Sequence, residues 1–326
     1  MAGKPEIARV AVVGSLVMDL TLWLPHFPRR GETLHPTRFE MFAGGKGFNQ
    51  AVAARRLGAQ VALVGRVGND AFAERFTEIL VREAIDHKHV VRDERLGTSL
   101  GIPLIDPSGE NCILGVPLAN TRLSAADVEA ARHLVEQSQV TLLQMEVPFE
   151  TSLRAAEIAR QAGAMVVLNP APAHPDARGF LERGPQGADL VDWLIANEIE
   201  AEMLSGIRVD GLSSARQAAR ALVARGLRRG AVVTLGAQGA VAATAQVERH
   251  VSAFPVQAVD PTGAGDSFCG AWAVALAEGM PLEDALRFAN AAGALCVMHA
   301  GAEPSLPRRA AVEAFLADHP AGPRPS

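Results

Sequence analysis

Short, fully apolar runs recur along the chain, and stretches with apolar residues at helical spacing separate most of them. Fully apolar runs rich in Val, Ile and Leu are typical of strands that are covered on both faces, as in a parallel sheet. Their regular alternation with helices predicts a doubly wound α/β fold with a mainly parallel sheet. The expected strands are residues 7–13, 61–67, 140–145, 165–168, 190–196 and 231–235.

The helices between these strands carry recognisable start signals. Asp70 precedes an apolar stripe that begins at Phe72 and is expected to cap that helix, and Ser124 with Asp127 forms a capping-box pattern. Residues 281–298 are apolar on nearly every side, which predicts a buried helix. Asn290 is its polar exception, and His299 follows its end.

Two segments break the alternation of strand and helix. Residues 20–42 are irregular and rich in proline, and residues 98–117 contain a hairpin turn at 106–109. We expect these two segments to form one small β-sheet that stands apart. The main α/β domain is then 1–19, 43–97 and 118–319, and residues 320–326 are expected to be a disordered tail.

Composition excludes several classes of protein. The 326 residues are 48% hydrophobic and 21% charged with a net charge of −5, and no basic block suggests nucleic acid as a partner. The three cysteines are widely spaced, which fits a reducing cytoplasm better than a disulfide framework or a zinc site. We expect neither a signal peptide at the N-terminus nor a membrane span.

One candidate site lies late in the chain, where Gly263, Ala264 and Gly265 precede Asp266 and an apolar helix. Small residues at the start of a helix let backbone N–H groups approach an anion. A carboxylate beside that anion suits a base that takes a proton from an attacking hydroxyl. Asp266 as a simple helix N-cap is an equally good interpretation of these residues alone.

A second glycine-rich block, residues 43–50, precedes a helix expected over 51–57. A phosphate-binding P-loop would need Ser or Thr after the lysine, but Gly47 follows Lys46. No Rossmann glycine pattern follows the first strand either. The block is therefore expected to bind a small polar ligand through Lys46 and Asn49, with a flexible turn as the alternative.

Polar residues follow several of the expected strands and fall on one edge of the sheet: Glu146, Asn169 and Asn197. Asn197 opens a helix that carries Glu198 and Glu200, which either complement the helix dipole or hold water around Mg²⁺. The glycine-bracketed turn 234–239 is placed to lie against a nucleotide. No G-x-S-x-G motif and no histidine cluster supports a hydrolase or a metal centre; His87 and His89 belong to a charged run expected to be exposed.

The two glycine-rich blocks, 44–51 and 260–266, together resemble the paired signatures of the PfkB (ribokinase-like) carbohydrate kinases. The polar residues between the blocks, the run 287–292 and the closing 301–305 occur in the order that the family has. The resemblance covers residues 7–318 and is specific, because two signatures occur in the right order. It implies an ATP-dependent kinase that phosphorylates a primary sugar hydroxyl, with ribose to ribose 5-phosphate as the first expectation.

The resemblance also implies roles for individual residues. Asp266 would be the base, and Gly263, Ala264 and Gly265 would form the anion hole for the transferring phosphoryl group. The sugar would lie against Val17, Met18, Asp19, Gly45, Lys46, Gly47, Phe48, Asn49 and Glu146. ATP would contact Asn197, Thr234, Leu235, Gly236, Ala237, Gln238, Gly239, Gly265 and Asn290.

Cations and a second subunit are implied in the same way. Glu200 would organise Mg²⁺ through water. A monovalent cation, K⁺, would be held by Asp260, Thr262, Cys296, His299, Gly301 and Ser305, several of them through backbone carbonyls. The small sheet resembles the family's lid, which closes over the sugar and forms the contact of a homodimer.

Two departures from the family's pattern bear on the substrate. Val17 stands where ribokinases typically have Asn, and Phe48 stands where they have Ala. Loss of the amide removes a hydrogen bond worth about 1 kcal/mol to a sugar hydroxyl, and Phe48 is expected to add bulk nearby. A kinase for a nucleoside or another sugar, and a non-catalytic regulator that binds sugar or nucleotide, stay open as alternatives.

Overall fold

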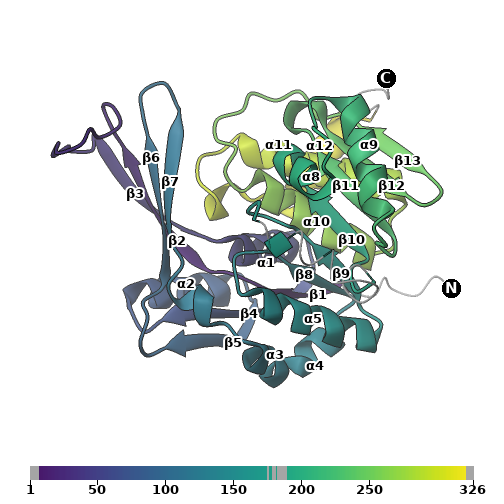
Figure 1. The fold of residues 1–326 in the computed structure, drawn as a ribbon, viewed down its shortest axis with the longest axis horizontal. Helices are drawn as coiled ribbons and strands as arrows, with labels where there is room; N and C mark the ends of the chain where they lie inside the picture. The colour runs from purple at the N-terminus through teal and green to yellow at the C-terminus, as the bar shows by residue number, and fades with distance from the viewer. Residues whose placement is uncertain (1–6, 175, 178–180, 182–188, 321–326) are drawn as a thin grey trace.

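The computed structural model describes residues 7–174, 176, 177, 181 and 189–320 (Figure 1). The expected tail, apart from Pro320, lies outside the described residues, as do residues 1–6. Every expected strand is present, with ends that differ from the expectation by a few residues. None of the described helices is long and apolar enough to cross a membrane.

The main sheet of the described residues has the strand order β13-β12-β11-β10-β9-β8-β1-β4-β5. All neighbouring pairs from β11 to β5 are parallel, and only β12 and β13 run antiparallel to their neighbours. The doubly wound, mainly parallel fold is confirmed. The strands are β1 (Arg9–Val13), β4 (Gln60–Gly68), β5 (Asp86–Asp93), β8 (Val140–Leu143), β9 (Met165–Leu168), β10 (Trp193–Ala196), β11 (Gly230–Thr234), β12 (Ala240–Thr244) and β13 (Glu248–Val251).

Three strands at the ends of this sheet were not expected. The run with His87 and His89, interpreted as an exposed charged segment, forms part of edge strand β5 and is half-buried apart from Lys88. An edge strand has one neighbour and tolerates polar side chains, so its sequence lacks the apolar signal of a central strand. At the other end, β12 is rich in alanine, which is a weak strand former, although four of its residues are buried.

Alternate residues of the central strands supply two separate cores. Val10 and Val12 of β1 belong to one apolar cluster, and Ala11 and Val13 belong to the other. One face of the sheet is covered by α1 (Lys46–Arg56), α2 (Ala71–Arg82), α10 (Ala264–Ala277), α11 (Leu282–Val297) and α12 (Arg309–Asp318). The other is covered by α3 (Ala125–Ala130), α4 (Arg132–Glu136), α5 (Phe149–Ala162), α8 (Glu198–Ser205) and α9 (Leu212–Val223).

The expected small sheet is present and stands apart from the main body, at the upper left of Figure 1. Its order is β3-β2-β6-β7, and β2 pairs with β6 in parallel while the other pairs are antiparallel. Its strands begin and end beyond the expected 20–42, because residues of the first glycine-rich block pair with β2. The strands are β2 (Val17–Trp23), β3 (Arg38–Gly44), β6 (Ser99–Ile105) and β7 (Asn111–Val116).

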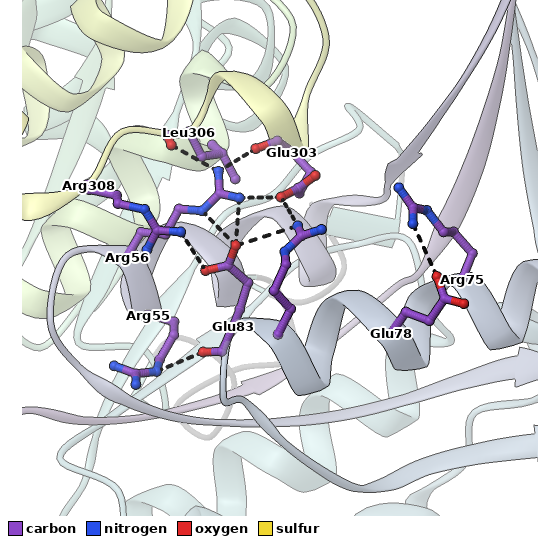
Figure 2. Close-up of polar contacts among 9 residues, drawn as sticks. Arg55, Arg56, Arg75, Glu78, Glu83, Glu303, Leu306 and Arg308 are labelled. Carbon is purple, nitrogen blue, oxygen red and sulfur yellow. Dashed lines mark hydrogen bonds and ion pairs between the residues drawn. The ribbon is translucent and has the colours of Figure 1, made fainter.

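A buried cluster of charges ties the C-terminal segment to the ends of α1 and α2 (Figure 2). Arg56, the last residue of α1, donates to the carboxylate of Glu83 at 2.8 Å and to that of Glu303. Its Nη1 atom donates to the carbonyls of Glu303 at 2.6 Å and Leu306 at 3.0 Å. All three charged side chains are less than a tenth exposed. The guanidinium therefore fixes the chain around the short 3₁₀ helix η3 (Glu303–Ser305).

We expect Arg56→Met to lower the free energy of unfolding by about 3 kcal/mol, because two buried carboxylates would lose the buried cation that they share and keep only the exposed Arg82 and Arg308. Urea unfolding at neutral pH measures the change. The matched control is Arg75→Met, which breaks an ion pair with Glu78 whose side chains are 57% and 67% exposed (Figure 2). That control should cost about 0–1 kcal/mol. Equal losses for the two variants would contradict the structural role given to Arg56.

Candidate active site

A cavity of about 620 Å³ lies between the small sheet and the edge of the main sheet where the parallel strands end. One wall comes from the small sheet, with Val17, Asp19, Gly101 and Gly115. The opposite wall comes from the two glycine-rich blocks and the segment after β8. It includes Gly45, Lys46, Asn49, Glu146, Thr262, Gly263 and Asp266. The structure thus brings together nine residues that the sequence assigned to the sugar, the anion hole, the cation or the base.

Glu146 is held where the first strand, the first helix and β8 meet. One of its oxygens accepts hydrogen bonds from Ser15 Oγ at 2.5 Å and from the backbone N–H of Lys46 at 2.9 Å. Ser15 Oγ in turn accepts from the N–H of Gly47 at 3.3 Å. A side chain on Gly47 would come within 2.5–2.7 Å of the Gly14–Ser15 backbone. Glycine is required there for α1 to begin so close to β1.

Asp19 reaches the cavity through a gap left by two glycines. A Cβ on Gly44 or Gly101, on the strands flanking β2, would lie 2.5 Å or 2.1 Å from its carboxylate oxygens. Burial, and then the charges of Glu146 and Asp266, raise the pKa of Asp19 to about 7. The ionised form of such a carboxyl group is stabilised when a ligand donates hydrogen bonds to it from hydroxyl groups.

Asp266 lies in the first turn of α10, as its third residue. The N-cap is Gly263, in a left-handed conformation with φ of 81°, so the interpretation of Asp266 as the N-cap is wrong. The carboxylate accepts from Asn49 Nδ2 and from Gln50 Nε2, each at 3.0 Å. Its negative charge is thereby satisfied by neutral amide donors, which is compatible with service as a base.

The start of α10 offers an open approach to an anion. The first bond of the helix runs from Ser267 N–H to the carbonyl of Gly263, so the amides of Gly265 and Asp266 precede it. A Cβ on Gly265 would meet nothing within 4 Å, so the glycine leaves the helix start bare. The Ala264 N–H donates to the carbonyl of Pro261 at 3.2 Å, which makes it a weaker member of the expected anion hole.

Lys46 supplies the positive charge of the cavity. Burial alone would lower the pKa of its ammonium group, but Asp266, Glu146 and Glu200 together raise it above the usual range. Lys46 therefore stays charged at neutral pH. Asn49, one helical turn later, is 5% exposed and has no partner for its Oδ1 atom. A buried acceptor without a donor fits a ligand hydroxyl in that place.

Two residues expected to touch the sugar face away from the cavity. Met18 is 2% exposed and belongs to the core, because neighbouring residues of β2 point to opposite faces. Phe48 is fully buried and packs edge-to-face on Phe76 of α2, with ring centroids 4.9 Å apart. The expectation that Phe48 adds bulk to the pocket is corrected: its ring fills the core between α1 and α2. Val17, by contrast, lines the cavity.

The segments expected to hold a monovalent cation do meet. The Asp260 carboxylate accepts from the N–H of Thr262 at 2.9 Å and from the N–H of Gly301 at 2.8 Å, which joins the two loops. Cys296 Sγ lies 3.0 Å from Ser305 Oγ and 3.6 Å from the Thr262 carbonyl. The Cys296 thiol is thus used inside the protein, while carboxylate and carbonyl oxygens are the donors that suit a hard cation.

The residues expected to contact ATP lie outside the cavity, along the neighbouring strand ends. Asn197 caps α8 in a capping box with Glu200, whose N–H donates to Asn197 Oδ1 at 2.9 Å. Burial raises the pKa of Glu200, and the hydrogen bond from the Asn197 backbone and the charge of Lys46 counteract part of this rise. Asn290 donates to the carbonyl of Val251 at 2.9 Å. A Cβ on Gly239 would lie 2.1 Å from that carbonyl, so Asn290 and the turn 234–239 lie side by side.

Several residues in or behind the cavity were not singled out from the sequence. Asn120 bonds both backbone groups of Leu16 and lines the cavity, and Gln50 and Gln144 form a buried amide chain to Asp266. A glutamine at the end of an apolar strand, as at Gln144, was the available signal. The sequence held no signal for Ser15, because a serine that follows a glycine is typical of an ordinary turn.

Comparison with known proteins agrees with this geometry. The model of the pfkB family carbohydrate kinases matches residues 7–309. A ribokinase of Haemophilus influenzae is 36% identical over 94% of this chain and 98% of its own length. A deoxyribokinase of Salmonella typhi is also 36% identical, over 91% of this chain and 95% of its own. The structure of Arabidopsis thaliana ribokinase complexed with ribose and ATP superposes with a TM-score of 0.87, at 30% identity over 95% and 99% of the two chains.

We expect Asp19→Asn to stabilise the ligand-free protein at alkaline pH while weakening sugar binding. The pKa of Asp19 is about 7 when folded against 3.8 ordinarily, so its carboxyl favours the folded state most below pH 4. As pH rises toward and through 7, the free energy of unfolding falls by at most about 1.4 kcal/mol for each unit by which the pKa is raised. An asparagine at this position does not titrate, so the variant does not lose this stability.

Urea unfolding at pH 5 and pH 8 measures the effect. The difference between the two pH values should shrink in Asp19→Asn and stay unchanged in Glu110→Gln, a change on the exposed β6–β7 hairpin. An Asp19→Asn protein with the pH dependence of the unsubstituted chain would contradict the strained environment of Asp19.

Proposed function

This chain belongs to the pfkB family of carbohydrate kinases, and on that premise we propose that it transfers the γ-phosphoryl group of ATP to a primary hydroxyl of ribose. The product would be ribose 5-phosphate. The observation that carries the proposal is Asp266, a buried carboxylate that lines the cavity at the bare start of a helix. A base and an anion site beside one cavity are what phosphoryl transfer to a hydroxyl requires.

The residues act as follows. Asp19, Asn49, Lys46 and Glu146 bind sugar hydroxyls and place the primary hydroxyl at Asp266. The carboxylate of Asp266 accepts the hydroxyl proton while the sugar oxygen attacks the γ-phosphorus, and the bond to the leaving oxygen of ADP breaks. The amides of Gly265 and Asp266, at the positive end of the α10 dipole, stabilise the oxygens of the transferring group.

ATP is proposed to lie along the strand ends beyond the anion site, with its base near the turn 234–239 and Asn290. Mg²⁺, when bound, neutralises charge on the phosphates. Among the described residues no group of three or more His, Cys, Asp or Glu side chains could hold a metal ion. Mg²⁺ would instead be held mainly by phosphate and water, with Glu200 orienting that water.

We assign a K⁺ site to the loops joined by Asp260, with Thr262, Gly301 and Ser305 contributing oxygens. These loops adjoin Gly263, so an ordered cation there would hold the start of α10 in place. Activity is therefore expected to be higher in K⁺ than in Na⁺ at equal ionic strength. Equal rates in the two salts would contradict the assignment.

The small sheet is proposed to close over the sugar and to pair with a second subunit. It supplies one wall of the cavity, and closure would keep water from the phosphoryl group. Phe39, Met41 and Leu114 of β3 and β7 are more than half exposed, which is unusual for large apolar side chains on a lone sheet. A light-scattering mass equal to one protomer would contradict the dimer.

The free cysteines fit a cytoplasmic protein, and the net charge of −5 fits the absence of a nucleic-acid partner.

A second acceptor is favoured by Val17. Its side chain lines the cavity two residues from Asp19, on the same face of β2. An isopropyl group cannot accept or donate a hydrogen bond, so it disfavours a substrate that presents a buried hydroxyl there. A sugar that lacks one hydroxyl, such as 2-deoxyribose, or a nucleoside with an apolar edge is therefore the second candidate. A relative that is a deoxyribokinase has the same identity to this chain as the ribokinase above.

An acceptor screen tests the proposal. We expect ADP release, in a coupled assay with ATP, Mg²⁺ and K⁺, to depend on added ribose or 2-deoxyribose. Inosine, adenosine and fructose should give lower kcat/KM. In Val17→Asn, kcat/KM for ribose relative to 2-deoxyribose should rise about fivefold or more, the value of one hydrogen bond. Binding of a sugar without ADP release from any acceptor would contradict a kinase and support a non-catalytic regulator.

A further inference from the structure

A chain of buried side-chain amides runs from the end of the main sheet to Asp266. Gln144 Nε2 donates to Gln50 Oε1 at 2.7 Å, and Gln50 Nε2 donates to Asp266 Oδ1 at 3.0 Å. Gln50 Nε2 also donates to Asn169 Oδ1 at 3.2 Å. Gln50 and Gln144 are fully buried, and Asn169 is 7% exposed. Buried amides are costly unless they are bonded, and the amide atoms of Gln50 and Asn169 are all bonded, while Gln144 Oε1 has no partner.

Asn169 determines which amide group donates and which accepts in each of these hydrogen bonds. Asn169 Nδ2 donates to the carbonyl of Ile195 at 2.9 Å, so its oxygen is the atom left to face Gln50. Gln50 must therefore present its NH₂ group to Asn169 and Asp266. Its oxygen then faces the NH₂ group of Gln144. Gln50 cannot turn over without breaking three hydrogen bonds.

The two amides that hold Asp266 differ in their access to the substrate. Asn49 and Gln50 are successive residues of α1, and each donates to a different oxygen of the carboxylate. Asn49 lines the cavity and keeps an unpartnered Oδ1 atom there. Gln50 does not line the cavity, and all its polar atoms are used inside the protein. A loss at Gln50 should therefore change the base without changing sugar contacts.

We propose that Gln50, anchored by Gln144 and Asn169, is a positioning residue that orients the Asp266 carboxylate toward the acceptor hydroxyl. This inference rests on the proposed kinase function. Neutral donors are suited to the task, because an N–H fixes an oxygen and lowers its ability to accept a proton less than a paired cation would. The sheet-anchored amides thus set which lone pair of Asp266 remains free for the substrate.

Other charged and titratable groups act on Asp266 and have to be separated from Gln50. Its charge couples to Lys46 of α1, Asp19 of β2, Glu200 of α8, Cys269 of α10 and Cys296 of α11. Among them, burial and neighbouring carboxylates raise the pKa of Asp19 to about 7, and burial also raises the pKa of Glu200. Because Asp19 is proposed to contact the sugar, kcat at saturating sugar is the quantity to follow, since it reports the substrate complex.

The test compares Gln50→Met, Gln50→Glu and a control in the pH dependence of kcat at saturating sugar and ATP. Loss of the donor in Gln50→Met disfavours the ionised base, so the acid limb should move up by about one pH unit. Misorientation should lower kcat about ten- to a hundredfold, the value of one hydrogen bond to a charged group. The sugar Kd from calorimetry should change less than about threefold, because Gln50 makes no cavity contact.

Gln50→Glu is nearly isosteric and places a second carboxylate beside Asp266. Like charges at hydrogen-bond distance cannot both ionise easily, so its acid limb should move further up than that of Gln50→Met. This variant keeps the inference testable if Gln50→Met does not fold. The control is Thr151→Val, which removes a buried bond from Thr151 Oγ1 to the carbonyl of Leu123, at 2.7 Å, in the first turn of α5.

Thr151→Val should lower Tm about as much as Gln50→Met does. Its kcat at 25 °C, and the acid limb of its kcat profile, should stay those of the unsubstituted chain. An acid limb that stays in place in the folded Gln50 variants would overturn the inference and leave Gln50 a structural residue only. A rise of tenfold or more in sugar Kd would also overturn it. Absence of sugar-dependent ADP release from the unsubstituted chain would instead contradict the function on which the inference rests.

Discussion

The concentration of negative charge around one cavity is the constraint on which the rest of the site depends. The ammonium group of Lys46 interacts with three carboxylates, those of Glu146, Glu200 and Asp266. A fourth carboxyl group, that of Asp19, is raised in pKa by the charges of Glu146 and Asp266. Partly buried carboxylates repel one another and lose hydration, so each needs a compensating partner. The cavity has more acid groups than cations, which suits a ligand that brings many hydroxyl donors and a metal-bound phosphate.

The fold provides these partners largely from backbone and neutral side chains. The start of α1 donates to Glu146, the capping box of α8 holds Glu200, and the glycines of β3 and β6 make room for Asp19. Asp266 receives two amides and sits in the first turn of α10. Three helix N-termini therefore converge on the strand ends, where their dipoles favour negative charge. The same dipoles that stabilise these carboxylates would stabilise a phosphoryl group in transfer.

Much of this could be predicted from the sequence, and the reasons are local. Apolar runs give the parallel strands, and each glycine-rich block precedes or contains a helix start, because such starts have few chemical solutions. The exact start was less well predicted: α1 begins at Lys46 and not at the expected residue 51, and α10 begins at Ala264. The direction of a side chain was harder to predict. Met18 and Phe48 lie next to site residues in sequence but point into the core, since adjacent residues of a strand or helix face different neighbours.

Long-range polar contacts were out of reach for the same reason. Gln50 and Asp266 are separated by 216 positions, and nothing in either segment names the other as its partner. Edge strand β5 was missed because its polar residues are tolerated only through its place at the rim of the sheet. What the sequence identified best is chemistry confined to one turn, and what it missed is chemistry assembled across the fold.

The central claim is that Asp266 is the base of a sugar kinase, and the most direct measurement is the turnover of Asp266→Asn beside its sugar affinity. The substitution keeps shape and removes the group that accepts a proton. The account predicts that kcat falls about 10²–10⁴-fold while ribose binds within a few-fold of the unsubstituted chain by calorimetry. A kcat within tenfold of the unsubstituted chain would contradict it.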